Sequence, residues 1–235
     1  MNCQIRPVAH IENDFQTKFG LPRQSGIIED ISGLIVFEPE FADPESLRGL
    51  EEYSHLWILW LFSENVRENE HFQATVRPPV LGGNVRKGVF ATRSPFRPNN
   101  IGMSVVRIEE IQFTGDRGPL IRVCGADLMN GTPIIDIKPY IPQWDSFPDA
   151  KSGFSGETEK EPLTVTWEAG VYETIHSMLT DEAMQALIRV LEEDPRPAYQ
   201  DDPERIYGFE YAGLEIRFRV ENRTVICLMP GICPV

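Results

Sequence analysis

The stretch Ser54-His55-Leu56-Trp57-Ile58-Leu59-Trp60-Leu61-Phe62 is apolar almost without alternation. A run of this length is typical of a β-strand and is far shorter than a membrane span. Strands that alternate apolar and polar residues have one solvated face, whereas an unbroken apolar strand is covered on both faces. We therefore expect a central strand over residues 55–62 that is buried on both sides and runs through the core.

Further short stretches rich in Val, Ile and Phe lie on either side of this run and are separated by Gly and Pro. This pattern favours a mostly antiparallel β domain. Asp43 before Pro44 predicts a short helical turn, because Asp caps helices and Pro is favoured at the first helical position. The other strands are expected over residues 4–10, 33–37, 89–91, 102–113 and 119–127.

The pattern changes between residues 140 and 162, which are rich in Pro, Ser, Gly, Asp and Lys and predict a linker. Beyond it, Thr180 is expected to cap an amphipathic helix that ends near Glu193, before Pro195. Strands are expected over 163–167, 206–211, 214–220 and 224–228, the last three as a meander. The predicted organisation is a β domain over 1–145, a linker over 146–162 and a small α+β domain over 163–235.

The size and composition of the chain limit its class. With 235 residues, of which 41% are hydrophobic, it is long enough for one large domain or for a domain with a smaller appendage. No apolar run approaches a membrane span, and the N-terminus lacks an apolar signal core. Its four cysteines show neither C-x-x-C spacing nor the density of a disulfide scaffold, so we expect a cytoplasmic protein.

The net charge of −14 argues against a nucleic-acid partner, but the charges are unevenly distributed. No Asp or Glu occurs from His71 to Ile108, a region that holds six Lys and Arg residues. If these lie together, they focus an attractive potential in one cleft while the acidic remainder keeps the protein soluble. The alternative is that they are scattered over several faces of the sheet.

The first motif with chemical potential runs from Arg77 to Asn99 and combines Gly and Pro with five Arg and Lys residues. Gly and Pro fix the shape of a loop, and Arg supplies forked donors for carboxylates or phosphates. The segment is either a rigid cationic loop that binds a ligand or a barrel rim whose arginines are solvated.

Two smaller motifs follow. Asp127 to Pro133 contains Asn130-Gly131, which is a turn signal first; beside a ligand, the Asp127 carboxylate could bind an adenine edge or a ribose hydroxyl. Asp194-Pro195-Arg196-Pro197-Ala198-Tyr199 holds one Arg between two prolines on a stiff segment, unless it is simply a helix stop with a solvated Arg. Tyr199, which ends this motif, could be an ordinary aromatic at the edge of the core.

Several common sites lack their sequence motifs. The chain has no G-x-G-x-x-G after a strand, no P-loop and no G-x-S-x-G, which disfavours a Rossmann-type cofactor site and serine hydrolase chemistry. The four histidines are scattered without metal-ligand spacing, and we expect no metal.

Taken in this order, the motifs resemble those of the TsaA-like family of TrmO-type tRNA methyltransferases. The resemblance also includes residues 21–24, 48–57, 77–102 and 127–142, and so covers nearly the entire chain. It implies a small antiparallel β-barrel that binds S-adenosylmethionine, a small C-terminal domain and a homodimer. It further implies methylation of N6 of N6-threonylcarbamoyladenosine at position 37 of threonine tRNA, in the anticodon loop.

The resemblance also assigns roles to residues of this sequence. Ser63 and Glu64 replace a His-Gln pair of relatives, and Asn130 stands where an acid is common. Asp194 is either the base or the residue that orients Arg196. The implied cofactor pocket comprises Pro22, Arg23, Gln24, Ser63, Glu64, Arg93, Asp127, Leu128, Met129 and Asn130. The residues implied to face the RNA are Arg86, Arg97 and Lys138, with Asp194, Arg196 and Tyr199 as catalytic residues.

Two other functions remain open from the sequence. A non-catalytic module that binds S-adenosylmethionine or RNA would keep the barrel residues without needing the Asp194 to Tyr199 motif. A hydrolase or isomerase on the same barrel would bind neither the methyl donor nor tRNA.

Overall fold

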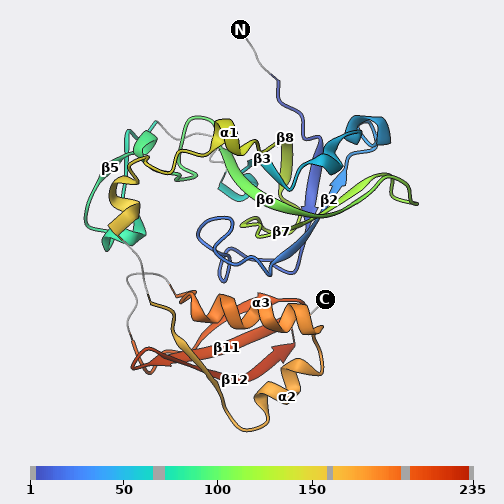
Figure 1. Cartoon of the computed structure of the whole chain (residues 1–235). Coiled ribbons are helices and arrows are strands. Elements are labelled where there is room, and N and C mark those ends of the chain that lie inside the picture. Colours follow the sequence, from blue (N-terminus) through green and yellow to red (C-terminus); the bar gives the residue numbers. More distant parts are fainter. Residues whose placement is uncertain (1–3, 66–71, 158–160, 197–201, 233–235) are drawn as a thin grey trace.

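The computed structural model describes residues 4–65, 72–157, 161–196 and 202–232. Six strands form a closed barrel in the order β1-β2-β7-β6-β3-β8, and every neighbouring pair is antiparallel (Figure 1). The predicted antiparallel barrel is confirmed. Its strands are β1 (Ala9–Glu12), β2 (Ser32–Phe37), β3 (His55–Leu61), β6 (Ile101–Gln112), β7 (Leu120–Cys124) and β8 (Pro133–Pro139).

The apolar run at residues 54–62 forms β3, but its two faces differ. Leu56, Ile58 and Trp60 are buried in the barrel core, whereas the residues between them are only half-buried. The prediction that both faces are buried is wrong, because a closed barrel encloses a single core. The outer face is apolar since it is partly covered by the chain after β8, where Asp145 accepts a hydrogen bond of 3.1 Å from Nε1 of Trp57.

The barrel interior fits closely around the Trp60 side chain. A Cβ placed on Gly102 would lie 2.3 Å from the Trp60 indole, so no larger residue fits there without a shift of the ring. The ring lies over Gly102, and its Nε1 donates a hydrogen bond of 3.0 Å to Oγ of Ser104. Glycine in β6 therefore allows the indole to reach a polar partner inside the barrel.

Short elements lie around the barrel, and two expected strands differ from prediction. The strand expected over 4–10 begins only at Ala9, and residues 89–91 form the 3-10 helix η5 (Val89–Ala91). A turn forms at η5 because the Val89 carbonyl accepts from both the amide and the hydroxyl of Thr92. The remaining elements are η1 (Pro44–Leu47), η2 (Leu50–Glu52), η3 (Ser63–Asn65), β4 (Thr75–Val76), η4 (Pro79–Leu81) and β5 (Lys87–Gly88).

The C-terminal part is α+β, as predicted. Thr180 caps α3 by accepting from the Ala183 amide at 3.2 Å. The sheet order is β10-β11-β12-β9, and β9 runs parallel to β12. The elements are β9 (Thr164–Trp167), α2 (Val171–His176), α3 (Asp181–Glu192), β10 (Tyr207–Tyr211), β11 (Leu214–Glu221) and β12 (Thr224–Ile232), of which α2 was not expected.

The long connection between β1 and β2 joins the two halves of the molecule. Figure 1 shows this connection lying over α3. Phe15, which is 1% exposed, packs in the C-terminal hydrophobic core, with its ring centroid 5.1 Å from that of Tyr211. Gly20 lies against the Phe209 ring, where a Cβ would be 2.5 Å away. The C-terminal core is therefore completed by residues from the N-terminal part of the chain.

The segment expected to be a linker is partly structured. Just before it lies α1 (Pro142–Asp145), and within it lies η6 (Gly153–Glu157). Nζ of Lys87 lies 5.6 Å from the centroid of the Phe154 ring, so this segment contacts the cationic stretch. Among the described residues, no helix is both long enough and apolar enough to cross a membrane.

Candidate active site on the barrel

The first predicted cofactor segment, Pro22 to Gln24, leads into Ser25 and Gly26, which fill a gap between two strands. Pairing of β7 with β6 ends at Cys124 and Arg107, although β6 begins earlier, at Ile101. Ser25 lies beside the part of β6 that β7 does not pair with, and its Oγ accepts a hydrogen bond of 3.2 Å from the Val105 amide. The Gly26 amide donates to the Gly125 carbonyl at 2.9 Å. The loop is thus held against the barrel where β7 leaves it.

Arg93 joins the predicted cationic loop, Arg77 to Asn99, to the loop that contains Gln24. Its Nη1 donates a hydrogen bond to Oε1 of Gln24, across 69 positions of sequence. The same guanidinium is close enough to Asp127 for its positive charge to lower the pKa of that carboxyl. Gln24, Arg93 and Asp127, which belong to three separate stretches of the sequence, therefore meet at one place on the barrel.

A hydrogen-bonded chain from the barrel interior orients Asp127. Trp60 donates to Oγ of Ser104, and the Ser104 hydroxyl donates to Oδ1 of Asp127 at 2.5 Å. Because Ser104 accepts from the indole, its one proton is directed at the carboxylate. Burial raises the pKa of Asp127 above that of an ordinary aspartate, although the Ser104 hydrogen bond, the amides of Asp127 and Ser25, and Arg93 lower it. Asp127 is thus a fixed acceptor whose charge is lost at a less acidic pH than usual.

We expect Ser104→Ala to weaken binding of the cofactor and to make that binding more sensitive to acid. The hydroxyl stabilises the ionised form of Asp127, so its removal raises the pKa of Asp127 further. As the pH is lowered, the variant should therefore lose its affinity for the cofactor at a higher pH than the wild type does, because Asp127 is protonated earlier. One lost charged hydrogen bond, about 1.5 to 3 kcal/mol, corresponds to a loss of about 10-fold to 150-fold near neutral pH. Calorimetric titrations from pH 5 to pH 8 measure both effects.

Thr132→Val is the matched control, since Thr132 is the other buried polar residue of the described barrel. It should leave both the affinity and its pH dependence unchanged. A Ser104→Ala protein that lost thermal stability but kept the wild-type pH profile would show that Ser104 only packs the barrel.

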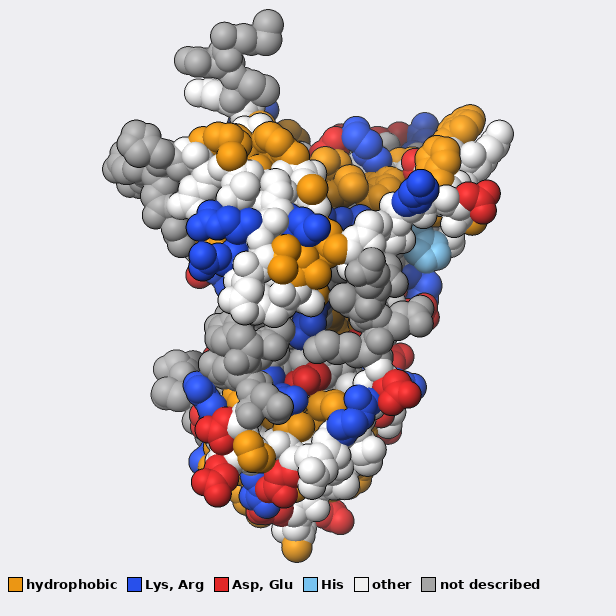
Figure 2. All heavy atoms as spheres, turned by 90° about the vertical axis from the view of Figure 1, so that its left-hand side faces the viewer, with side chains coloured by type: hydrophobic (Ala, Val, Ile, Leu, Met, Phe, Trp, Pro, Cys, Tyr) orange, Lys and Arg blue, Asp and Glu red, His pale blue; other side chains and the backbone are white. Residues whose placement is uncertain are grey.

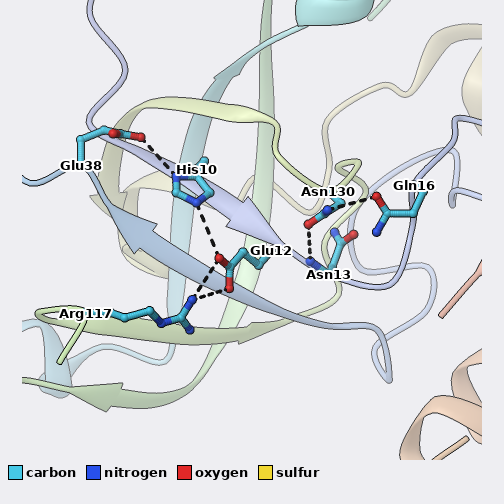
Figure 3. A network of polar contacts seen from close by, with 7 residues as sticks. All are labelled: His10, Glu12, Asn13, Gln16, Glu38, Arg117 and Asn130. Atoms are coloured by element: carbon cyan, nitrogen blue, oxygen red, sulfur yellow. Dashed lines mark hydrogen bonds and ion pairs between the residues drawn. The ribbon is translucent and has the colours of Figure 1, made fainter. Parts of the chain in front are cut away.

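The turn that follows Asp127 holds the β1–β2 connection. Figure 3 shows Asn130 between two partners: its Oδ1 accepts from the Asn13 amide and its Nδ2 donates to Oε1 of Gln16, both at 3.1 Å. The Asn13 side chain donates to the Leu128 carbonyl at 2.7 Å. In the same view, His10 and Glu12 of β1, Glu38 just after β2 and Arg117 of the β6–β7 turn form a neighbouring polar network. Asn130 therefore orders the connection that carries Phe15.

The other cofactor candidates differ in exposure. Leu128 is buried, Pro22 and Met129 are half-buried, and Arg23 is exposed. Ser63 and Glu64 are exposed on η3, directly after β3, which ends beside β6. Asp127 and its hydrogen-bond partners are thus the most enclosed polar part of the candidate pocket.

Two hollows lie on the outer surface of β3 and β6, near the loop that contains Gln24 and Ser25. One, of about 210 Å³, reaches Ser25 and extends past His55 and Arg107. The other, of about 380 Å³, is lined by His55, Trp57, Val105, Tyr140 and Asp145. The first adjoins the cofactor candidates through Ser25, next to Gln24, whereas the second lies farther along the same strands.

The cationic stretch gathers on one face of the molecule. The left side of Figure 1 carries residues 72–97, with η4, β5 and η5. Figure 2 views that side and shows Lys and Arg with few acidic side chains over its upper, barrel half, whereas the lower half mixes both charges. Arg86 donates to Thr75 at 3.1 Å, and Arg97 folds onto the carbonyls of Thr92 and Ser94. This arrangement supports a clustered cationic surface.

The remaining substrate and catalytic candidates show two kinds of ion pair. Lys138, which the resemblance places facing the RNA, forms an exposed ion pair of 2.8 Å with Asp136 on β8. Asp194 and Arg196 form a bidentate pair with distances of 2.8 and 3.0 Å, and their side chains are only 18% and 11% exposed. Asp194 has a positive φ of 53° directly after α3, which turns the chain sharply. Tyr199 lies outside the described residues.

Sequence reasoning missed Ser25, Ser104 and Trp60 as supporting residues of this site. Ser104 stands between Gly102 and Val106 at positions that point into the barrel, and a lone polar residue in such a series is a detectable signal. Among the described residues, no group of three or more His, Cys, Asp and Glu side chains is placed to hold a metal ion.

Comparison with known proteins shows the family of the chain. The family models for the tRNA-methyltransferase O N-terminal domain and the TrmO C-terminal domain match residues 10–146 and 160–229. The chain belongs to the TrmO family. The resemblance found in the sequence is thereby confirmed, and the two matched regions correspond to the barrel and the C-terminal α+β part.

Relatives of similar length match along almost the whole chain. The tRNA (adenine(37)-N6)-methyltransferase of Escherichia coli is 36% identical over 223 residues, which cover 93% of this chain and 94% of that protein. A putative S-adenosylmethionine-dependent methyltransferase of Pseudomonas aeruginosa is 36% identical and is covered to 96%, as is this chain. The crystal structure of TrmO from P. aeruginosa superposes with a TM-score of 0.79 at 30% identity, covering 99% of this chain and 98% of the other.

Proposed function

We propose that the chain transfers a methyl group from S-adenosylmethionine to N6 of N6-threonylcarbamoyladenosine at position 37 of threonine tRNA. The observation that carries this proposal is the meeting of Gln24, Arg93 and Asp127 on the barrel. The E. coli relative is a tRNA (adenine(37)-N6)-methyltransferase, and the P. aeruginosa relative is a putative S-adenosylmethionine-dependent methyltransferase. Membership of the same family supports the same activity for this chain.

The chemistry of the donor set fits this cofactor. S-adenosylmethionine offers ribose hydroxyls, amino groups and a carboxylate, and when bound it supplies a methyl group already activated by a sulfonium. Asp127 is a fixed acceptor for hydroxyl or amino protons, and Arg93 is a donor for an anionic group. Because Gln24 is held by Arg93, the loop and the cationic stretch would bind the ligand as one unit.

The substrate requires little further catalysis. As the new bond between N6 and the methyl carbon forms, the sulfur–methyl bond breaks and N6 gives up its proton to a base. The threonylcarbamoyl group makes N6 a urea-like nitrogen, more acidic than an adenine amine. The main task of the protein is to hold the substrate and to align N6 with the methyl group. Correct alignment of two bound reactants by itself lowers the activation free energy.

We assign Arg196 the role of pairing with the threonyl carboxylate. Its guanidinium is held in one plane by the bidentate contact with Asp194, so little side-chain freedom remains to be lost on binding. Both oxygens of Asp194 are engaged in that contact, which favours an orienting role for Asp194 over a role as the base. An unmodified adenosine lacks the carboxylate that would contact Arg196, which gives selectivity for the modified base.

We also propose that the enzyme is cytoplasmic and homodimeric. The described cysteines, Cys124 and Cys227, are free and buried, and burial raises the pKa of Cys227 to about 12. Such thiols are unreactive, and they suit a compartment in which disulfides are not used for stability. Sedimentation of the purified protein tests the dimer.

Methyl transfer to two tRNA preparations tests the proposed function. Threonine tRNA carrying the threonylcarbamoyl group should accept methyl from the labelled donor, and the same tRNA without that group should accept far less. Equal transfer to both would contradict the substrate assignment. Binding of the donor with no transfer to either would favour the non-catalytic module.

A further inference from the structure

Two aromatic rings are exposed together on the cationic stretch. Phe72 and Phe90 are 59% and 71% exposed, yet their rings lie against one another, with centroids 6.2 Å apart and planes inclined by 26°. Both belong to the region without Asp or Glu that begins at His71. We call Phe72 and Phe90 the aromatic pair.

The local structure directs Phe90 outward. In η5 the preceding residue, Val89, is 1% exposed, and its amide donates to the Ala74 carbonyl at 2.9 Å. Its carbonyl accepts from Thr92, which closes the turn. Because the Val89 amide and carbonyl are both hydrogen-bonded and its side chain is buried, the next side chain, Phe90, points to solvent. Phe90 keeps 71% of its surface in water, and exposed aromatic rings that lie together are typical of a binding surface.

The charges around the aromatic pair select the kind of partner. Arg77, Arg86 and Arg93 are exposed in the same stretch, and Figure 2 shows that this face of the barrel half carries few acidic side chains. Aromatic faces combined with cationic side chains are the usual arrangement for single-stranded nucleic acid, because bases stack on the rings while phosphates contact the cations.

We propose that Phe90, supported by Phe72, is the platform on which an unpaired base of the tRNA anticodon loop stacks. The proposal rests on the proposed function and adds the residue that holds the loop. Phe90 precedes Arg93 by three residues, so their Cα atoms are at most about 11 Å apart. Arg93 contacts Gln24 in the candidate cofactor pocket, so a base on Phe90 belongs to the loop that carries the target adenosine.

The test measures tRNA affinity of Phe90→Leu over a series of salt concentrations. Leucine keeps an apolar side chain but removes the ring, and stacking contributes about 1 to 3 kcal/mol per base, so the Kd should rise about tenfold. Because no charge is lost, the slope of log affinity against log salt should not change. Arg86→Ala should lower that slope by about 0.7 to 0.9, as expected for one phosphate contact.

Two further variants complete the comparison. Phe90→Tyr retains a ring and should bind tRNA like the wild type. Tyr172→Leu removes an aromatic ring of α2 in the C-terminal part, 37% exposed, and should also have no effect.

The outcomes separate this inference from the proposed function. Wild-type affinity of Phe90→Leu, with methylation of tRNA intact, would overturn the stacking platform alone. A change in oligomeric state of Phe90→Leu would also overturn it, because the aromatic pair would then be a contact between copies. A wild-type protein that neither binds nor methylates tRNA would overturn both.

Discussion

Arg196→Ala is expected to lower kcat on threonylcarbamoylated tRNA by about 100-fold or more while the Kd for S-adenosylmethionine stays within about twofold. Arg196 makes its bidentate contact with Asp194, whereas in the candidate cofactor pocket Arg93 donates to Gln24 and Ser104 donates to Asp127. If Arg196 pairs with the substrate, its loss affects turnover and not cofactor binding. Single-turnover methyl transfer and calorimetry measure the two quantities.

Two variants sharpen this expectation. Arg196→Lys keeps the charge but loses the forked geometry, so it should recover only part of the turnover. Arg93→Ala should show the opposite pattern and weaken cofactor binding about tenfold or more through the lost contact at Gln24. Unchanged cofactor affinity in Arg93→Ala, or weakened cofactor affinity in Arg196→Ala, would contradict this division between the two arginines.

Phe15→Ala should reduce the free energy of unfolding by about 3 to 5 kcal/mol, as for other fully buried phenylalanines. Phe15 is 1% exposed and fills the C-terminal core from a connection that starts in the barrel, with Tyr211 edge-on to its ring. Because that core is shared, the variant should lose hydrogen-exchange protection in β10 and α3 although the mutation lies before β2. Denaturant unfolding gives the energy, and exchange mass spectrometry gives the location.

Phe15→Leu is the control, since it refills most of the space and should cost considerably less. Exchange that increases only in the barrel, or a loss below about 1 kcal/mol, would show that the β1–β2 connection merely covers the C-terminal part.

Much of the fold was predictable from local signals. Thr180 and the apolar spacing after it define α3, and the meander of β10, β11 and β12 agrees with the expected strands within a few residues. The double-sided burial of β3 was predicted wrongly because an apolar outer face has the same sequence pattern as a second core. β8 was absent from the expected strands, since Pro133 and Pro139 stand at its two ends.

The candidate site was only partly predictable, for a physical reason. Gln24, Arg93 and Asp127 are far apart in sequence, and neither charge nor periodicity shows that they meet; the family resemblance alone named them together. The role of Phe15 is a long-range packing effect, which a local pattern does not reveal. Ser104 could have been found as the one polar residue at the inward positions between Gly102 and Val106.

The most direct test of the central claim is to incubate the protein with labelled S-adenosylmethionine and tRNA from cells that lack it, and then to separate the modified nucleosides. The proposed function predicts label in N6-methyl-N6-threonylcarbamoyladenosine from threonine tRNA, and far less label from a reaction with Arg196→Ala under single-turnover conditions of equal duration. Folded protein that binds the cofactor but leaves this nucleoside unlabelled would contradict it.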